Sequence, residues 1–364
     1  MKLFIQISLL ILLSHTVLNH ADAEPIFSCC ATDDTHTGRP DERAPISIMG
    51  DHTHKQGGWM VSYRYMNMDM DGMRRGNNRV SFSDVFESAY AITPESMTME
   101  MNMLGLMYGL TDKLTLTLMG NYTESKMKHR IISPETADVI NAGATEFTTH
   151  TSGIGDVRLG GLYRFYLQEN RKAHIGLSFS MPTGSIDKKD RTPGMGGPAN
   201  RQLPAAMQLG SGTFDLLPSL TFIQQFTDWS YGIQTNIVIR MEDENNNGYR
   251  LGNVFGATTW TGYKLNRWIA LNTGLSYMHT DELKGNQEDV NQNSMTGRSV
   301  TTAFGENYGG ERLDALFGLN CYIPKGSFKN HRLAIDARLP VWQDLNGLQL
   351  ETDLSITIGW QTAF

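Results

Sequence analysis

The chain has 364 residues, enough for one large domain or two ordinary ones. Its formal net charge of −7 at pH 7 argues against nucleic acid as the main partner, because such a partner requires a concentrated positive surface. Methionine (20 residues) and glycine (36 residues) are unusually frequent, whereas three cysteines in a chain of this length do not indicate a disulfide framework.

The N-terminus has the parts of a secretory signal peptide. Lys2 precedes an apolar run from Leu3 to Leu13, and alanines stand at positions 21 and 23. The run is too short to span a bilayer and remain there. We therefore predict a signal peptide at residues 1–23, cleaved after Ala23. Lipoprotein processing at Cys29 is the alternative.

The rest of the chain alternates apolar and polar residues over many segments. From Leu333 to Val341 the odd positions are apolar, and the even positions include Asp336 and Arg338. A period of two over nine or more residues predicts a strand with one face in an apolar medium. No stretch has a convincing 3.6-residue period, so we expect pure β structure. Twelve such segments begin near Trp59, Met97, Leu114, Gly153, Ala173, Thr213, Tyr231, Leu251, Trp268, Arg312, Leu333 and Gln349.

The connections between these segments are either short or long. Short turns lie at 111–113, 227–228 and 266–267, and long polar stretches lie at 71–95, 127–151, 184–212 and 284–310. This asymmetry is typical of an outer-membrane barrel, which must be closed because an open sheet edge in lipid leaves backbone groups unpaired. We predict an all-β, up-and-down antiparallel transmembrane β-barrel of about 12 strands over residues 57–364. A periplasmic N-terminal leader precedes it at residues 24–56.

The last strand carries a terminal signal. Leu354, Ile356, Ile358 and Trp360 share one face with Phe364, the final residue. An alternating strand that ends in Phe is similar to the signal read by the outer-membrane assembly machinery. We therefore expect the chain in the outer membrane of a Gram-negative bacterium. Its expected partners are outer-membrane lipid and, through Phe364, the barrel assembly machinery.

Two motifs resemble a known family. Pro182-Thr183-Gly184 and the later run LGSGTFDLLP, from Leu209 to Pro218, resemble the phenol-degradation MetA-pathway family of bacterial outer-membrane β-barrels. The resemblance extends from about Met49 to Phe364. It implies a barrel with a transport-like role, and it supplies no catalytic residues.

Methionine occupies one face of the second predicted strand. That face is opposite Leu104 and Leu106, so we expect it to look into the lumen, next to similar faces on the neighbouring strands. Thioether sulfur prefers Cu(I), which makes this face a candidate copper or silver site. The alternative is that flexible methionines fill an irregular lumen. The candidate ligands are Met60, Met66, Met68, Met97, Met99, Met101 and Met103.

These patterns predict a transport or channel role for a small solute, because twelve strands enclose a narrow lumen. Charges predicted to face inward form a crosslinked wall that is structural or sets solute selectivity. They are Arg64, Asp156, Arg158, Arg164, Arg240, Arg312, Asp314, Asp336 and Arg338. The alternatives are a soft-metal binding or export barrel, an outer-membrane enzyme, and a structural barrel without transport. No nucleotide motif or Ser-His-Asp set is recognisable, so we expect no catalytic residues and no cofactor other than Cu(I).

Overall fold

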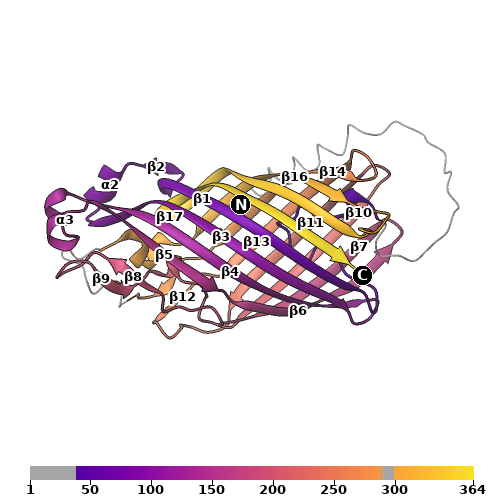
Figure 1. The fold of residues 1–364 in the computed structure, drawn as a ribbon, viewed down its shortest axis with the longest axis horizontal. Coiled ribbons are helices and arrows are strands. Elements are labelled where there is room, and N and C mark those ends of the chain that lie inside the picture. The colour runs from indigo at the N-terminus through magenta and orange to yellow at the C-terminus, as the bar shows by residue number, and fades with distance from the viewer. Residues whose placement is uncertain (1–37, 288–289, 291–298) are drawn as a thin grey trace, which may run out of the picture. The chain divides into compact units, whose positions relative to one another are not determined.

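The computed structural model describes residues 38–287, 290 and 299–364. The predicted signal peptide and Cys29 lie outside the described residues. Within them, eleven strands form one closed antiparallel ring, with β17 paired to β1 (Figure 1). In order they are β1 (Trp59–Gly76), β3 (Ile92–Gly109), β4 (Leu114–Ile131), β6 (Val157–Gln168), β7 (Arg171–Met181), β10 (Asp215–Gln225), β11 (Trp229–Arg240), β13 (Val254–Lys264), β14 (Ile269–Thr280), β16 (Gly310–Tyr322) and β17 (His331–Ala363).

The last strand, β17, doubles back on itself. Its 33 residues pair with β16 as far as Leu345, and with β1 at Leu345 and again from Gln349 onward. Gly347 lies between the two parts with φ at +54°, a left-handed backbone conformation that favours glycine. The described part of the wall is therefore crossed twelve times, which agrees with the predicted number. The prediction of an all-β transmembrane barrel fold is confirmed.

Smaller elements occupy the long connections. The strands are β2 (Asn78–Val80), β5 (Glu146–Ile154), and the two pairs β8 (Lys189–Thr192) with β9 (Ala199–Gln202) and β12 (Tyr249–Arg250) with β15 (Lys284–Gly285). The helices are α2 (Phe82–Glu87) and α3 (Pro134–Ile140), and the 3-10 turns are η2 (Ala205–Met207), η3 (Thr301–Ala303) and η4 (Gly305–Asn307). A further 3-10 turn, η1 (Pro40–Glu42), precedes β1. None of the helices in the described part of the chain has the length and apolar character that crossing a membrane requires.

The two short α-helices differ from the expectation of pure β structure. Each begins at a serine whose hydroxyl accepts a backbone N–H: Ser81 from Asp84 at 3.3 Å, and Ser133 from Thr136 at 3.2 Å. Such caps satisfy N–H groups that the first turn leaves without a partner. Both helices have fewer than eight residues, too short for a 3.6-residue pattern to stand out in the sequence.

The outward face of the ring is an apolar band. On β3, Leu104 and Leu106 are exposed, whereas Met103, Gly105 and Met107 between and beside them are buried. This alternation confirms the predicted facing of the strand. On eight of the other strands the outward face carries Leu118, Leu159, Leu177, Leu220, Ile233, Leu271, Leu319, Ile335 and Ile358. Exposed aromatic side chains lie near the short turns, as in the girdles of outer-membrane barrels: Trp59, Tyr163, Trp229, Tyr263 and Trp268.

Three strands continue beyond this band toward the long connections. β1, β3 and β4 each have 18 residues, longer than the 9–11 that a tilted strand needs to cross a bilayer. In their far halves the outward positions become polar: Asn67, Asp69, Thr98, Glu100, Glu124 and Lys126. Charged side chains are costly against lipid. We therefore infer that these halves project from the membrane as a collar on the side of the long loops.

The boundary between band and collar predicts the cost of a buried charge. Leu106→Arg places a cation against lipid and should lower the free energy of unfolding by roughly 2–4 kcal/mol. Glu100→Arg, on the same face of β3 but in the collar, should cost about 0–1 kcal/mol. Reversible unfolding by urea in lipid vesicles measures both values. Equal costs at the two positions would place the band elsewhere.

The final residue closes the ring at its lower edge. The backbone N–H of Phe364 donates to Trp59 at 2.9 Å, and that of Trp59 donates to Phe364 at 2.8 Å. Deleting Phe364 removes both bonds and the terminal aromatic side chain, so we predict less assembled barrel in isolated outer membranes. Phe364→Tyr keeps the bonds and the ring and serves as the control. Gel mobility before and after heating measures the folded fraction, and normal assembly of the deletion variant contradicts the prediction.

Candidate functional site

A segment from the N-terminal part of the chain lies inside the barrel. We call residues 39–54 the plug segment; they belong to the range predicted as a periplasmic leader, whose boundaries stay a prediction. Ile46 is 1% exposed and Ile48 is 4% exposed. Ile48 and Ala44 pack in a buried cluster with Ile223 and Trp260 of the wall. The plug segment is therefore embedded among side chains that face the lumen.

Polar wall side chains hold the backbone of the plug segment. They come from β1, β7, β11, β16 and β17, which lie on opposite sides of the ring. Arg64 Nε donates to Ile46 O (2.9 Å), His174 Nε2 to Gly50 O (2.8 Å), Gln234 Nε2 to Met49 O (3.0 Å), Asn320 Nδ2 to Arg43 O (3.2 Å), Arg332 Nη2 to Ala44 O (2.5 Å), and Ser230 Oγ to Asp41 O. The segment is thus tied across the lumen.

A charged group strengthens this attachment. Asp336 Oδ2 accepts the N–H of Ser47 at 2.8 Å, and Arg338 donates to the Ser47 hydroxyl at 3.1 and 2.9 Å. Arg64, Asp336 and Arg338 are three of the charges predicted to face inward. Each of the three forms a hydrogen bond with the plug segment, so these charges bind the plug.

The plug segment carries its own buried hydrogen-bonded pair, Asp51 and His52. Asp51 Oδ1 lies 2.6 Å from Nδ1 of His52. Burial, followed by the charge of Arg43, lowers the pKa of His52 to about 3, so its ring is neutral at neutral pH. Burial opposes ionisation of Asp51, but His52, Arg43 and Arg332 outweigh it and hold the pKa of this carboxyl well below its usual range. A buried carboxylate therefore faces the wall cation Arg332.

A cavity of about 340 Å³, the lower cavity, lies against the plug segment. Residues 47–50 of the plug form one side of it. Its wall side chains are mixed in character and include Arg64, Met107, Met119, Arg158, Gln234 and Arg338. The lower cavity is therefore a cationic, partly apolar space directly beside the plug.

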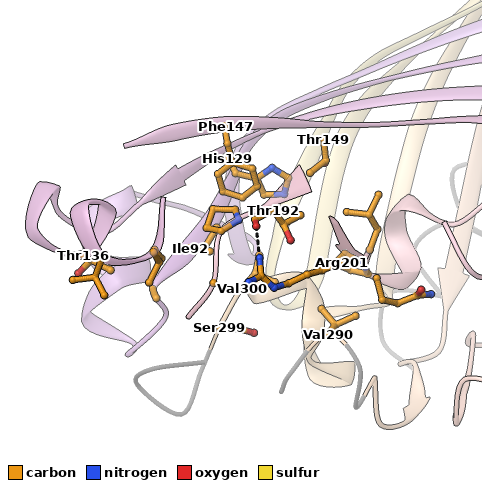
Figure 2. Close-up of a pocket in the computed structure, with 18 of the residues that line it drawn as sticks. Ile92, His129, Thr136, Phe147, Thr149, Thr192, Arg201, Val290, Ser299 and Val300 are labelled. Carbon is orange, nitrogen blue, oxygen red and sulfur yellow. Dashed lines mark hydrogen bonds between the residues drawn. The ribbon is translucent and has the colours of Figure 1, made fainter. Parts of the chain in front are cut away.

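A second cavity, the upper cavity, lies near the long loops and measures about 260 Å³. It is bounded by the inward faces of β4 and β5, by α3, and by the β8–β9 hairpin (Figure 2). His129 of β4 stacks on Phe147 of β5, with the ring centroids 4.5 Å apart and an angle of 2° between the ring planes. Most of the other lining side chains are apolar, among them Ile92, Ile140, Leu203 and Val300.

A cluster of methionines separates the two cavities along the wall. Buried Met97, Met127, Met207 and Leu203 pack together, with Met70 and Met99 beside them; we call this group the methionine cluster. On β4, His129 lines the upper cavity, Met127 belongs to the cluster, and Met119 lines the lower cavity. On β3 the corresponding residues are Ile92, Met97 and Met107. Both strands give the same order from the loops inward.

The strands bring the predicted metal ligands together only in part. β1 and β3 pair in the predicted order, with Met66 opposite Met101 and Met68 opposite Met99. Met60 lies apart from the methionine cluster, in a cluster with Met107 and Leu162. Met60, Met97 and Met103 are buried, whereas Met66, Met68, Met99 and Met101 are half-buried. Within the described residues, no group of three or more His, Cys, Asp or Glu is placed to hold a metal.

Met207 joins the cluster from the long connection at 184–212, which strand periodicity did not assign to the lumen. The two family motifs hold this connection in place at Asp156. The carboxylate of Asp156 accepts the N–H of Gly184 at 2.9 Å, and the N–H and hydroxyl of Ser211 at 2.8 and 3.0 Å. A Cβ on Gly184 would come within 2.7 Å of the Cα of Gly210, so the close approach requires glycine.

The wall changes its pairing at the same point. β4 pairs with β5 from Ile154 back to Glu146, and with β6 from Arg158 onward, and Asp156 lies between. β7 pairs with β6 and ends at Met181, so the connection after it starts beside this interruption. Asp215, also in the second motif, accepts from Thr213 Oγ1 at 2.7 Å and from Arg240 Nη1 at 2.5 Å. These bonds explain why the motif residues are polar and small.

The closed barrel, its plug segment and its chain of cavities define the class of outer-membrane β-barrel channels. Residues 87–319 match the family described as "Putative MetA-pathway of phenol degradation". The chain belongs to this family. A search of curated proteins finds no match.

Solved structures agree with this fold. An outer-membrane channel from Pseudomonas putida F1 is 14% identical, covers 87% of this chain and 99% of its own, and has a TM-score of 0.58. The toluene transporter TodX of Pseudomonas putida (11% identity, 84% and 89% coverage, TM-score 0.40) and a Pseudomonas aeruginosa FadL homologue (10%, 85% and 90%, TM-score 0.39) are more distant. At 14% identity the channel from Pseudomonas putida F1 establishes the fold alone.

The methionine cluster allows a direct test of soft-metal binding. If it holds a metal, purified barrel should bind Cu(I) or Ag(I) but not Zn²⁺ or Mg²⁺, because the thioether is a soft, neutral ligand. Replacing Met97, Met127 and Met207 with Leu nearly conserves volume, at under about 1.5 kcal/mol per site, and should remove metal binding while folding survives.

Met60→Leu, outside the cluster, is the matched control for this substitution. Competition with a Cu(I) chelator measures affinity in the unmodified chain, the triple variant and the control. Identical curves for all three would assign the methionines to packing.

Proposed function

We propose that this protein is a channel in the outer membrane of a Gram-negative bacterium, and that it passes a small solute when the plug segment is displaced. The carrying observation is that the ring is complete without the plug. β1 pairs with β17 over the whole height of the wall, and the plug segment contributes no strand to the sheet. Displacing it therefore leaves the backbone ladder of the wall intact.

The way the plug is bound also supports its displacement. Its contacts are mainly single hydrogen bonds from wall side chains to its backbone carbonyls. Each such bond stabilises by only about 1 kcal/mol, or about 1.5–3 kcal/mol when the donor is charged, because water replaces it. Water can replace these hydrogen bonds when the plug leaves, and the apolar contacts that must also break are those of the small cluster that Ala44 and Ile48 form with Ile223 and Trp260.

The inner wall is cationic once the plug has left. Arg64, Arg332 and Arg338 then lose their partners on the plug, and Lys172 loses Glu42, from which it lies 2.6 Å. Asp336 also loses Ser47 but is a single carboxylate among them. We infer that the open channel prefers anions over cations of the same size.

We further propose that outer-membrane lipid surrounds the apolar band. The barrel assembly machinery would recognise the strand that ends at Phe364. The proposed function includes no catalytic step. The solved structure that supports the fold is described as an outer-membrane channel.

Soft-metal binding or export is the second candidate function. The observation that favours it is the meeting of Met97, Met127 and Met207 with Met70 and Met99 in one cluster on the path between the cavities. The chelator competition described above tests it separately from conductance.

Weakening the plug should open the channel. Arg64→Ala or Arg332→Ala removes a charged donor to the plug, worth about 1.5–3 kcal/mol, and should raise the population of the open state by roughly 10- to 100-fold. Single-channel recording in planar bilayers measures open probability, and the reversal potential in a salt gradient measures ion preference. Arg75→Ala changes an exposed arginine that donates to Ser88 in the loops, and is the control.

Unchanged open probability in both plug variants would contradict plug displacement. The absence of conductance even after residues 39–54 are deleted would contradict the channel itself.

A further inference from the structure

We propose that the upper cavity is a binding site for a small, uncharged, mostly apolar solute that carries one hydroxyl group. The inference rests on the proposed function in one respect: the bound solute is taken to be one that the channel admits. The site itself follows from the size of the cavity, the character of its walls, and two buried polar atoms that face it.

The size of the upper cavity matches a single ring. An apolar protein cavity of about 150 Å³ is large enough to bind benzene. The upper cavity, at about 260 Å³, therefore has room for one ring and a short substituent. Its apolar wall belongs to a buried cluster that includes Ile92, Ile140 and Val300, with Phe147 packed against it. A packed apolar wall of this kind favours a compact, poorly hydrated solute.

Two polar atoms of the cavity wall lack partners. Among the residues that the structure describes, none offers a hydrogen bond to Nδ1 of His129 or to Oγ1 of Thr149. Both side chains line the upper cavity and are more than nine-tenths buried. A buried polar group left without a partner costs about 1–3 kcal/mol. A ligand that satisfies both atoms would recover this free energy on binding.

The register makes His129 and Thr149 neighbours on the wall, and we infer that one ligand group reaches both polar atoms. Met127 of β4 is directly opposite Thr149 of β5, and His129 is opposite Phe147, so His129 and Thr149 are diagonal neighbours on the inward face. A ligand hydroxyl donates one proton and accepts at its oxygen. In the His129 tautomer that carries its proton on Nε2, the ligand hydroxyl can therefore donate to Nδ1 while it accepts from the Thr149 hydroxyl.

The charged residues at the cavity do not favour an anion. Arg201 is already engaged. Its Nη1 donates to Thr192 O at 2.6 Å (Figure 2). Its Nη2 donates to Met195 O and Gly197 O at 3.3 and 3.1 Å. These bonds close the β8–β9 hairpin. Glu135 of α3 lies at the exposed rim and repels a carboxylate. The expected ligand is therefore neutral.

The floor of the upper cavity suggests how the solute continues inward. Leu203 lines the cavity and also packs in the methionine cluster. Unbranched methionine side chains repack easily, because they have three rotatable bonds and no polar head. Rearrangement of Met97, Met127 and Met207 would connect the upper cavity with the lower cavity. The solute bound in the upper cavity is thus separated from the lower cavity by the flexible, apolar methionine cluster.

Equilibrium binding of three ring-sized probes tests the chemical class. Benzyl alcohol, toluene and benzoate are titrated by calorimetry into the full chain in detergent, with blank micelles subtracted. We expect benzyl alcohol to bind, toluene to bind at least about fivefold more weakly because it leaves both polar atoms unpaired, and benzoate not to bind measurably. Equal affinity for alcohol and toluene, tighter binding of benzoate, or no binding of any probe overturns the proposal.

Substitutions at the two polar residues locate the site. Thr149→Val keeps the shape of the side chain, and His129→Phe keeps a ring stacked on Phe147. Each should weaken benzyl alcohol binding at least about fivefold and leave toluene binding unchanged. Thr148→Val, at the exposed outward position next in β5, is the matched control. If the control weakens binding as much as Thr149→Val, the cavity is not the site.

The three probes on the unmodified chain decide the question even if a variant fails to fold. Binding and conductance also separate the two proposals. If the chain conducts but binds no probe, the channel proposal holds and the upper binding site is wrong. If it binds benzyl alcohol but never conducts, the binding site holds and the channel proposal is wrong.

Discussion

Closure of the backbone hydrogen-bond ladder between β1 and β17 is the constraint on which the rest of the structure depends. A strand edge facing lipid would leave its N–H and C=O groups unpaired, so the ring must be complete. The register that completes it pairs Met60 with Ala363 and Tyr65 with Ile358. Since side chains alternate along each strand, this register fixes which residues meet lipid and which face the lumen.

The interior that closure creates is filled by segments from outside the wall. The plug segment enters at one end, and the connection that contains Leu203 and Met207 enters from the other. Asp156 ties the second of these segments to the wall. It lies where the pairing partner of β4 changes from β5 to β6, and it accepts three hydrogen bonds from the family motifs. A carboxylate with three donors is well satisfied, which explains why a charged side chain is stable there.

Polar wall residues in this barrel act mostly on backbone groups. Arg64 and Arg332 donate to plug carbonyls, and Arg201 donates to the carbonyls of its own hairpin. Segments without regular pairing carry many free carbonyls, and a guanidinium with several donors satisfies more than one at once. The lumen is therefore organised by side chains that hold irregular backbone, and the cavities are the space that remains between the segments so held.

The sequence by itself determined the barrel. Period-two alternation placed all twelve wall crossings, including the two parts of β17, and it oriented Leu104 outward and Met103 inward. This succeeded because a strand between lipid and lumen meets a different medium on each face, and that difference is written into neighbouring residues. For the long connections the sequence predicted only their positions and lengths. Their short helices and hairpins do not lie between two different media, so no period-two pattern marks them.

Only the tertiary structure decided what the lumen contains. The methionines of β1 and β3 were expected as one surface, but Met60 lies with Met107 and Leu162, while Met97 meets Met127 and Met207. Met207, Leu203 and the plug segment reach the interior from connections whose sequence does not show which side of the wall they take. Likewise His129 and Thr149 are 20 positions apart in separate strands, and only the register between β4 and β5 makes them neighbours at one cavity. Strand periodicity shows whether each residue faces lipid or lumen. A binding site depends on which residues, distant in the sequence, are brought together, and only the tertiary structure shows that.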